Sequence, residues 1–289
     1  MSSPDTLTQI EAAVEHRYAR NGKSKLHVAT AGDGRLILFL HGFPDHWLGW
    51  HAIMAPFLGT HRVAAMDLRG FNLSEQPLEP EAYDLETLVG DVAAAIDVCG
   101  AKSAVIVGHD WGGWLAWQVA ITRPDLVDGL VILNMPHPWA IARELAINPR
   151  QEAASAYVRA FQQPGAEKAV PLDRLSQWIS DPAFRERHNQ AYARTQLGAP
   201  MNYYRVHFPA PPYKVLETPP APVKAPTLII HGLTDVYALP EGLNGVWDWI
   251  EAPTTIHAWP GVGHFVQHEK PGRVVSALSS FFRTYGFSR

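Results

Sequence analysis

The sequence predicts an α/β protein with a doubly wound, mostly parallel sheet that is interrupted by a helical insertion. Three observations lead to this fold class: short apolar runs alternate with amphipathic helical patterns, most runs are continuous and β-branched, and one long stretch breaks the alternation. Continuous apolar strands are typical of parallel sheets covered by helices on both faces. The chain has 289 residues, of which 47% are hydrophobic, and this is enough for a large core with an insertion.

Six apolar runs are predicted as strands, and helices are predicted between them. The runs cover residues 35–42, 63–70, 103–110, 128–136, 227–235 and 254–264. Residues 85–99 place apolar side chains on one helical face, with Asp84 as N-cap. A second helix is expected over residues 111–121 and is ended by the following Pro124, and a last helix is expected after Pro271. Such sheets bind ligands beyond the carboxyl ends of their strands.

The stretch from residue 137 to 224 breaks this alternation. It is polar and helical in pattern, and it leads into the proline-rich segment FPAPPYKVLETPPAPVKAP. Because it stands between two sheet strands, we interpret it as a helical lid inserted into a core formed by residues 1–136 and 225–289. A separate domain is the alternative.

Charge and composition exclude several classes of partner. The formal net charge is -4 and no basic block stands out, so we expect no nucleic-acid partner. The single cysteine, Cys99, allows no internal disulfide and fits a reducing compartment. No segment has the pattern of a signal peptide or a membrane span. We therefore expect a soluble, cytoplasmic protein without membrane insertion, metal or cofactor; a homodimer is compatible with the sequence.

The strongest chemical signal is GHDWGG, which follows a buried strand and opens a helix. This context matches the nucleophile elbow G-x-Nu-x-G, in which small residues flank a nucleophile on a tight turn. Here the nucleophile position holds Asp110. A carboxylate that attacks an acyl carbon would form an anhydride, whereas attack on a saturated carbon leaves an enzyme ester that water can hydrolyse. We therefore predict alkyl transfer to Asp110; the alternative is a helix N-cap.

Two later residues are placed to assist Asp110. In proteins with this elbow, the order along the chain is nucleophile, acid, histidine. Asp235 follows the fifth apolar run and His264 follows the sixth. We predict that His264 is the general base that activates water and that Asp235 orients its imidazole. Taken singly, each could be an ordinary loop residue. In some proteins with this elbow the acid follows the earlier strand. Here that position holds Asn134, whose amide cannot carry the negative charge of an acid.

The segment HGFP after the first run is predicted to form the oxyanion hole. In proteins with this elbow, the main-chain amide after HG and the one after the nucleophile stabilise the oxyanion. These amides belong to Phe43 and Trp111. The Phe43–Pro44 bond is a candidate for the cis form, since tight turns are where cis-proline occurs. The alternative is an ordinary turn at the end of a strand.

Four motifs together resemble the epoxide hydrolases of the α/β-hydrolase superfamily. They are HGFPDHWLGW, MDLRGFNLSEQP, GHDWGG and GHFVQHEKP, and the likeness runs through nearly the whole chain. Haloalkane dehalogenases share these motifs. The resemblance implies an α/β-hydrolase fold, an aspartate nucleophile and hydrolysis of an epoxide to a vicinal diol. Detoxification, catabolism and biosynthesis are all roles open to such an enzyme.

The resemblance also implies two lid tyrosines whose hydroxyls hold the epoxide oxygen. In AYVRAFQQPG, Tyr157 stands at the position before the family's F-Q-x-P-G segment, and in MNYYRVHF, Tyr204 stands in its N-[YW]-Y-R segment. The chemistry needs such donors, because opening an epoxide creates an alkoxide that a phenol can protonate. Packing is the alternative for both. Tyr203 is adjacent to Tyr204, but on a helix the two side chains point about 100° apart.

Two other functions compete with epoxide hydrolysis. A haloalkane dehalogenase would share the same three catalytic residues but would need halide donors, for which Trp111 with Trp139 or Trp178 could serve. A non-catalytic ligand receptor on this fold would be expected to have lost a catalytic residue, and none is missing.

Apolar residues near these motifs indicate the kind of ligand. Phe43, Trp111, Met135 and Trp139 predict an apolar pocket for a small epoxide, with water as the second substrate.

Overall fold

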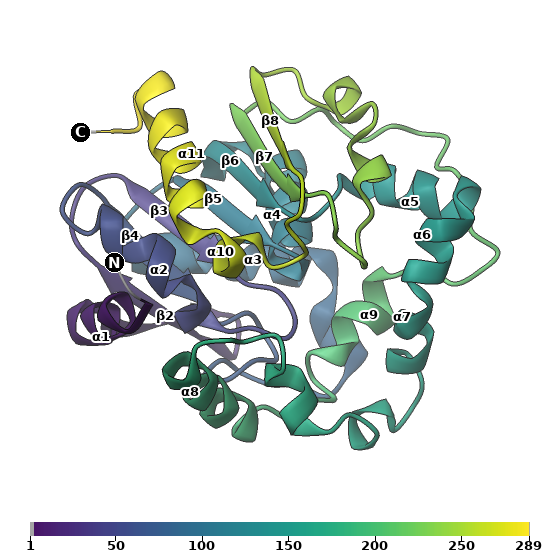
Figure 1. The fold of residues 1–289 in the computed structure, drawn as a ribbon, viewed down its shortest axis with the longest axis horizontal. Helices are drawn as coiled ribbons and strands as arrows, with labels where there is room; N and C mark the ends of the chain where they lie inside the picture. Colours follow the sequence, from purple (N-terminus) through teal and green to yellow (C-terminus); the bar gives the residue numbers. More distant parts are fainter. Residues whose placement is uncertain (1–2, 289) are drawn as a thin grey trace.

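The structure is a computed structural model that describes residues 3–288. Within these residues an eight-stranded sheet has the order β1-β2-β4-β3-β5-β6-β7-β8 (Figure 1). Strands β3 to β8 are parallel to one another, which confirms the predicted doubly wound, mostly parallel sheet. The strands are β1 (Glu15–Asn21), β2 (Ser24–Ala31), β3 (Leu36–Leu40), β4 (Arg62–Met66), β5 (Ala104–His109), β6 (Val127–Leu133), β7 (Thr227–Gly232) and β8 (Thr254–Trp259).

The sequence analysis missed the first two strands. Strands β1 and β2 form an antiparallel hairpin, and β2 joins the sheet antiparallel to β4. Strand β1 is an edge strand made mostly of polar, solvent-facing residues, so it lacks the apolar run that marked the other strands. The available signal was Asn21-Gly22, where Gly22 has a φ of 58°, since a two-residue hairpin turn favours glycine at such angles.

The buried side chains of the sheet divide between its two faces because successive residues of a strand point in opposite directions. Leu38 and Ile106 belong to the core under α3 and α4, whereas Phe39 and Val107 belong to the core under α2 and α11. No helix of residues 3–288 is both long and apolar enough to cross a membrane. The helices are α1 (Ser3–Ala13), α2 (His51–Met54), α3 (Leu85–Val98), α4 (Trp111–Thr122), α10 (Val266–Glu269) and α11 (Pro271–Thr284).

The chain between β6 and β7, called the insertion (residues 134–226), is built from short helices. Most of them begin with a capping side chain and a proline in the first turn; His137, Asn148 and Asp181 accept hydrogen bonds from the helix amides. In Figure 1 the insertion gathers beside one end of the sheet. Its helices are α5 (Pro138–Ile147), α6 (Pro149–Ala154), α7 (Ala156–Phe161), α8 (Pro182–Ala193) and α9 (Met201–His207).

A buried ion pair fastens the hairpin to the rest of the core. Arg69, after β4, donates two hydrogen bonds of 2.6 and 2.7 Å to Asp91 of α3, and both side chains are at most 4% exposed. Asn21 at the hairpin turn donates to the same carboxylate, and Arg69 also donates to Ser24. The pair therefore joins the hairpin, the loop after β4 and α3 at one point.

Removing one partner of this pair should destabilise the protein strongly, because it leaves an uncompensated buried charge. We expect Asp91→Ala to lower the free energy of unfolding by about 3 kcal/mol, and Arg69→Met with Asp91→Leu to cost less. Urea unfolding measures both. The exposed Arg123–Asp125 pair is the control, and Asp125→Ala should cost under about 0.5 kcal/mol. Equal effects of Asp91→Ala and Asp125→Ala would contradict the role of the buried pair.

Candidate active site

Asp110 occupies the junction between β5 and α4. Its φ of 51° and ψ of -123° are a conformation that residues with side chains rarely adopt. The turn is tight because Gly108 and Gly112 approach so closely that a Cβ on Gly108 would collide with the backbone of Gly112. Asp110 is the N-cap residue of α4 by position, but within residues 3–288 its carboxylate accepts no hydrogen bond from a helix amide, so the side chain is not engaged in capping. The carboxylate faces the loops that follow β3 and β8.

The structure brings His264 and Asp235 to Asp110. His264 Nδ1 lies 2.7 Å from Asp235 Oδ2, and His264 Nε2 lies 3.6 Å from Asp110 Oδ2. The other oxygen of Asp235 accepts hydrogen bonds of 2.8 and 3.1 Å from the amides of Tyr237 and Ala238. Both oxygens of Asp235 are therefore fixed, and the three side chains form one chain of contacts, each residue at most 7% exposed.

Two buried side chains that the sequence analysis did not assign hold this arrangement. Asn134, at the end of β6, donates a 2.7 Å hydrogen bond to Asp235 Oδ2 and a 3.2 Å hydrogen bond to the carbonyl of Gly263. His109 Nε2 donates a 3.0 Å hydrogen bond to the main-chain oxygen of His264. The only signal in the sequence was the position of each residue. Asn134 directly follows a strand, and His109 stands at the x position before the nucleophile in G-x-Nu-x-G.

The charges of the site set the protonation of His264. Burial opposes a charge on its imidazole, but Asp235 and Asp110 outweigh this effect and raise the pKa of His264 to about 10. Burial also opposes ionisation of Asp235, yet the charge of His264 lowers the pKa of Asp235 to about 2. The pKa of Asp110 is lowered as well, because the hydrogen bond and charge of His264 outweigh burial. At neutral pH the free site thus holds an imidazolium between two carboxylates.

The main chain after β3 supplies one hydrogen bond to the nucleophile position. The amide of Phe43 donates to Asp110 Oδ1 at 2.8 Å. This approach requires glycine at position 42, because a Cβ on Gly42 would collide with the Asp110 side chain. No hydrogen bond joins the Trp111 amide to this carboxylate in the part of the chain described. The Phe43–Pro44 peptide bond is cis, as expected.

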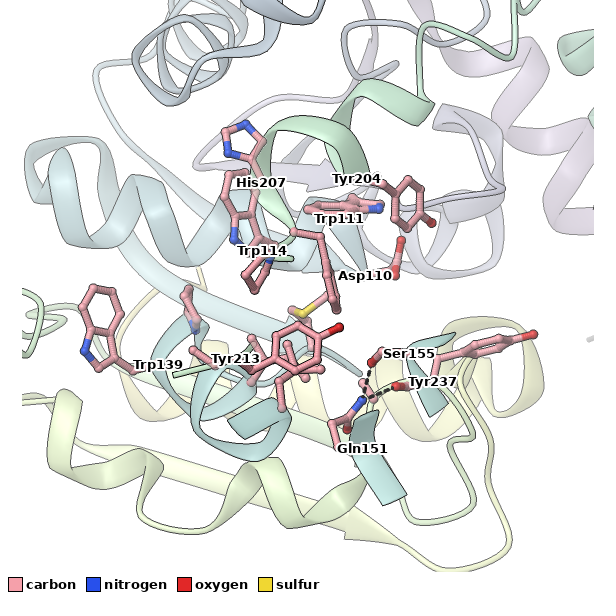
Figure 2. A pocket seen from close by; sticks show the side chains of 18 of the residues that line it. Asp110, Trp111, Trp114, Trp139, Gln151, Ser155, Tyr204, His207, Tyr213 and Tyr237 are labelled. Atoms are coloured by element: carbon pink, nitrogen blue, oxygen red, sulfur yellow. Dashed lines mark hydrogen bonds between the residues drawn. The ribbon is translucent and has the colours of Figure 1, made fainter. Parts of the chain in front are cut away.

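Two cavities, called the tryptophan cavity and the phenylalanine cavity, meet at Asp110. Figure 2 shows the tryptophan cavity. The tryptophan cavity has a volume of about 390 Å³ and is lined by Trp111, Trp114 and Trp139. The phenylalanine cavity has a volume of about 380 Å³ and is lined by Phe43, Phe161 and Phe265. Of the four predicted pocket residues, Phe43 lines the phenylalanine cavity, whereas the tryptophan cavity contains Trp111, Met135 and Trp139.

Tyr157 of α7 and Tyr204 of α9 both line the two cavities beside Asp110. Their ring centroids are 6.1 Å apart, and Figure 2 shows Tyr204 next to Asp110. Burial raises the pKa of both phenols, so they stay protonated as hydrogen-bond donors. Tyr203 points elsewhere, with its ring packed 5.5 Å from Tyr83 and outside both cavities.

A second histidine and aspartate connect the loops of the site. His268 stands four residues after His264, a spacing that can hold a metal ion, but it lies 2.9 Å from Asp45 Oδ2 instead. Burial opposes ionisation of Asp45, yet the charge and hydrogen bond of His268 hold the pKa of Asp45 well below its usual value. The pair joins the segment after β3 to α10. No group of three or more metal-binding side chains is found among residues 3–288.

The raised pKa of His264 predicts a pH dependence of stability. Between the usual pKa of about 6.5 and about 10, the folded protein keeps a proton that the unfolded chain releases. This contribution to the free energy of unfolding is fully present below about pH 6.5 and is lost as the pH rises through about 10. We expect wild-type stability to fall across this window relative to His264→Gln, as measured by urea unfolding. Parallel curves for the two proteins would contradict the raised pKa.

Comparisons with known proteins place the chain in a family. The family model described as alpha/beta hydrolase fold matches residues 35–271. Epoxide hydrolase 3 of Xenopus tropicalis is 32% identical, over 98% of this chain and 81% of its own length. The AB hydrolase superfamily protein YfhM of Bacillus subtilis is 30% identical, over 93% and 98%.

A solved structure gives the same result. The Bacillus megaterium epoxide hydrolase in complex with an inhibitor matches with a TM-score of 0.84 and 30% identity, over 92% of this chain and 100% of that one. The chain therefore belongs to the α/β-hydrolase family, and its resemblance to the epoxide hydrolases of that family is confirmed.

Proposed function

We propose that this protein hydrolyses epoxides to vicinal diols by way of a covalent ester on Asp110. The observation that carries the proposal is the placement of a buried carboxylate at the elbow, opposite two tyrosine hydroxyls and between two apolar cavities. A carboxylate there can attack a saturated carbon, and phenols can protonate the oxygen that leaves. The similarity to proteins named epoxide hydrolase supports the same reaction.

In the first step, Asp110 attacks one epoxide carbon. Its Oδ1 is held by the Phe43 amide, so Oδ2 is the attacking oxygen. A bond forms between Oδ2 and the carbon, the carbon–oxygen bond of the ring breaks, and its electron pair goes to the epoxide oxygen. Tyr157 or Tyr204 donates its proton to that oxygen, and an ester with one free hydroxyl remains on the enzyme.

Ester formation changes the charge on the base. The charge and hydrogen bond of Asp110 are among the causes of the raised pKa of His264. Because the ester has no charge, the pKa of His264 falls, and the proton that it loses restores the tyrosine hydroxyl. A neutral imidazole that can take a proton from water therefore exists at the ester stage, where it is needed.

In the second step, water attacks the carbonyl carbon of the ester. His264, oriented by Asp235, takes one proton from that water. The oxyanion is stabilised by the amides of Phe43 and Trp111. When the tetrahedral intermediate collapses, the former Oδ2 leaves with the product, and the proton of the new carboxylic acid completes the diol. Asp110 is again a carboxylate and His264 is again charged.

The insertion supplies both tyrosines, so we propose that residues 137–224 act as a lid on a core formed by residues 1–136 and 225–289.

The dehalogenase alternative is not favoured. The similarity to proteins named epoxide hydrolase favours the other reaction. Of the two indoles that could assist Trp111 in holding a halide, Trp178 already donates its Nε1 hydrogen to the carbonyl of Leu175 at 2.8 Å, whereas Trp139 Nε1 has no partner among residues 3–288. A role in detoxification and a cytoplasmic location stay predictions.

The direct test is turnover of styrene oxide and an aliphatic epoxide beside 1-bromobutane and fluoroacetate, with diol and halide both measured. The proposal predicts diol without halide release. Halide release without diol would favour the dehalogenase and leave both tyrosines as packing residues. No turnover of any epoxide would favour a ligand receptor.

Replacing the base should trap the ester. We expect His264→Gln incubated with styrene oxide to gain the mass of the substrate on the peptide that contains Asp110, because attack proceeds while hydrolysis stops. Intact and peptide mass spectrometry measures this gain. Asp110→Ala is the control and should show neither the adduct nor turnover. Normal steady-state turnover by either variant would refute the mechanism.

Removing a tyrosine hydroxyl should slow ring opening. We expect Tyr157→Phe and Tyr204→Phe each to lower kcat/KM by about 10²-fold or more, since general acid catalysis is typically worth that much. Tyr203→Phe is the matched control, because Tyr203 is adjacent and buried but lies outside both cavities. Similar rates for all three variants would mean that the two lid tyrosines only pack.

A further inference from the structure

Tyr237 lies at the reacting centre but has no part in the proposed reaction. Among residues 3–288, five line both cavities: Tyr237, the nucleophile, the base and the two lid tyrosines. The ring centroid of Tyr237 is 5.1 Å from that of His264 and 5.5 Å from that of Tyr157. The ring is therefore a neighbour both of the group that would activate water and of a group that would hold the epoxide oxygen.

The main chain of Tyr237 is fixed from two directions. Its amide donates to Asp235 Oδ1, and its carbonyl accepts a 2.8 Å hydrogen bond from Gln151 Nε2 of α6. Gln151 is fully buried, and its Oε1 accepts a hydrogen bond from the Leu239 amide. Figure 2 draws Gln151 with its bonds to Ser155 and to Tyr237. Because Gln151 of the insertion and Asp235 both hold this segment, the backbone from which the ring projects has a defined position.

The hydroxyl of Tyr237, unlike its main chain, is not held by the protein. The residue is 43% exposed and its neighbour Val236 is 64% exposed, whereas Asp235 and Ala238 are at most 6% exposed. Within residues 3–288 its hydroxyl has no hydrogen-bond partner at normal distance. In Figure 2 the Tyr237 ring and Trp139 lie at opposite ends of the view. The ring thus borders the tryptophan cavity on the side away from Trp139, where the phenylalanine cavity begins.

We propose that Tyr237 is a specificity-determining residue that partitions the two cavities and limits the size of a second substituent on the epoxide. This inference rests on the proposed function. The carbon attacked by Asp110 lies where the cavities meet, so substituents on both epoxide carbons extend into different cavities and pass beside the ring. An epoxide with one substituent needs only one of the two cavities and does not pass the ring.

The test compares two aryl epoxides that differ in the second substituent. The measured quantity is kcat/KM for diol formation from trans-stilbene oxide divided by that from styrene oxide. Tyr237→Ala should raise this ratio about tenfold or more, because the space occupied by a ring is then open. Tyr237→Trp should lower the ratio. Tyr237→Phe keeps the ring and should hold the ratio within about twofold, whatever its rate.

A matched control removes the same side chain elsewhere in the site. Tyr213 lines the tryptophan cavity but not the phenylalanine cavity, so Tyr213→Ala enlarges one cavity without joining the two. Its ratio should stay near that of the unaltered protein. If Tyr237→Ala does not fold, Tyr237→Leu, which also lacks a ring, decides the question by the same ratio.

The outcomes separate this inference from the function on which it rests. A ratio that rises with Tyr237→Ala and falls with Tyr237→Trp supports the partition. An unchanged ratio in both, or an equal rise in Tyr213→Ala, overturns the partition while diol formation from styrene oxide keeps the function intact. Absence of diol from either epoxide with the unaltered protein overturns both.

Discussion

The turn between β5 and α4 holds Asp110 at a φ of 51°. This backbone conformation sets the position of the Asp110 carboxylate, and the rest of the site is arranged around it. A side chain in such a conformation costs about 1–3 kcal/mol and persists only where the surroundings enforce it. Here β5 lies in the middle of the sheet, and the glycines on either side let strand and helix meet without a gap. The unfavourable backbone conformation of Asp110 is thus maintained by the packing of the central strand β5 against α4.

Two aspartate–histidine pairs organise the loops around that carboxylate. Asp235 and His264 join the loops after β7 and β8, and Asp45 and His268 join the segment after β3 to α10. Both histidines come from one short stretch of chain, so the pairs fix the base and the Phe43 amide relative to each other. The positive charge of His264 lies between the carboxylates of Asp110 and Asp235. This explains how one imidazole can first pair with the Asp110 nucleophile and later act as a base towards water. It becomes a base only after Asp110 has lost its charge.

The sequence predicted the parts of this protein that depend on local pattern. Most of the strands β3 to β8 have continuous apolar runs, and Asp110 stands in a motif whose turn admits few alternatives. The hairpin was missed because its edge strand is polar, and Asn134 was set aside because it cannot carry a charge, although it donates to the residue that does. Tyr237 carries no motif at all. Its position follows from hydrogen bonds between segments 86 residues apart in the chain, which no local pattern reveals.

The ester on Asp110 is the central claim, and a single turnover in ¹⁸O-labelled water tests it most directly. Enzyme in excess over epoxide is allowed to react once, and the diol and the peptide containing Asp110 are weighed by mass spectrometry. If Asp110 attacks the carbon, the diol takes its second oxygen from the carboxylate, so the diol is unlabelled and Asp110 carries the ¹⁸O. If water attacks the epoxide directly, the diol carries the ¹⁸O and Asp110 stays unlabelled, which would contradict the ester mechanism.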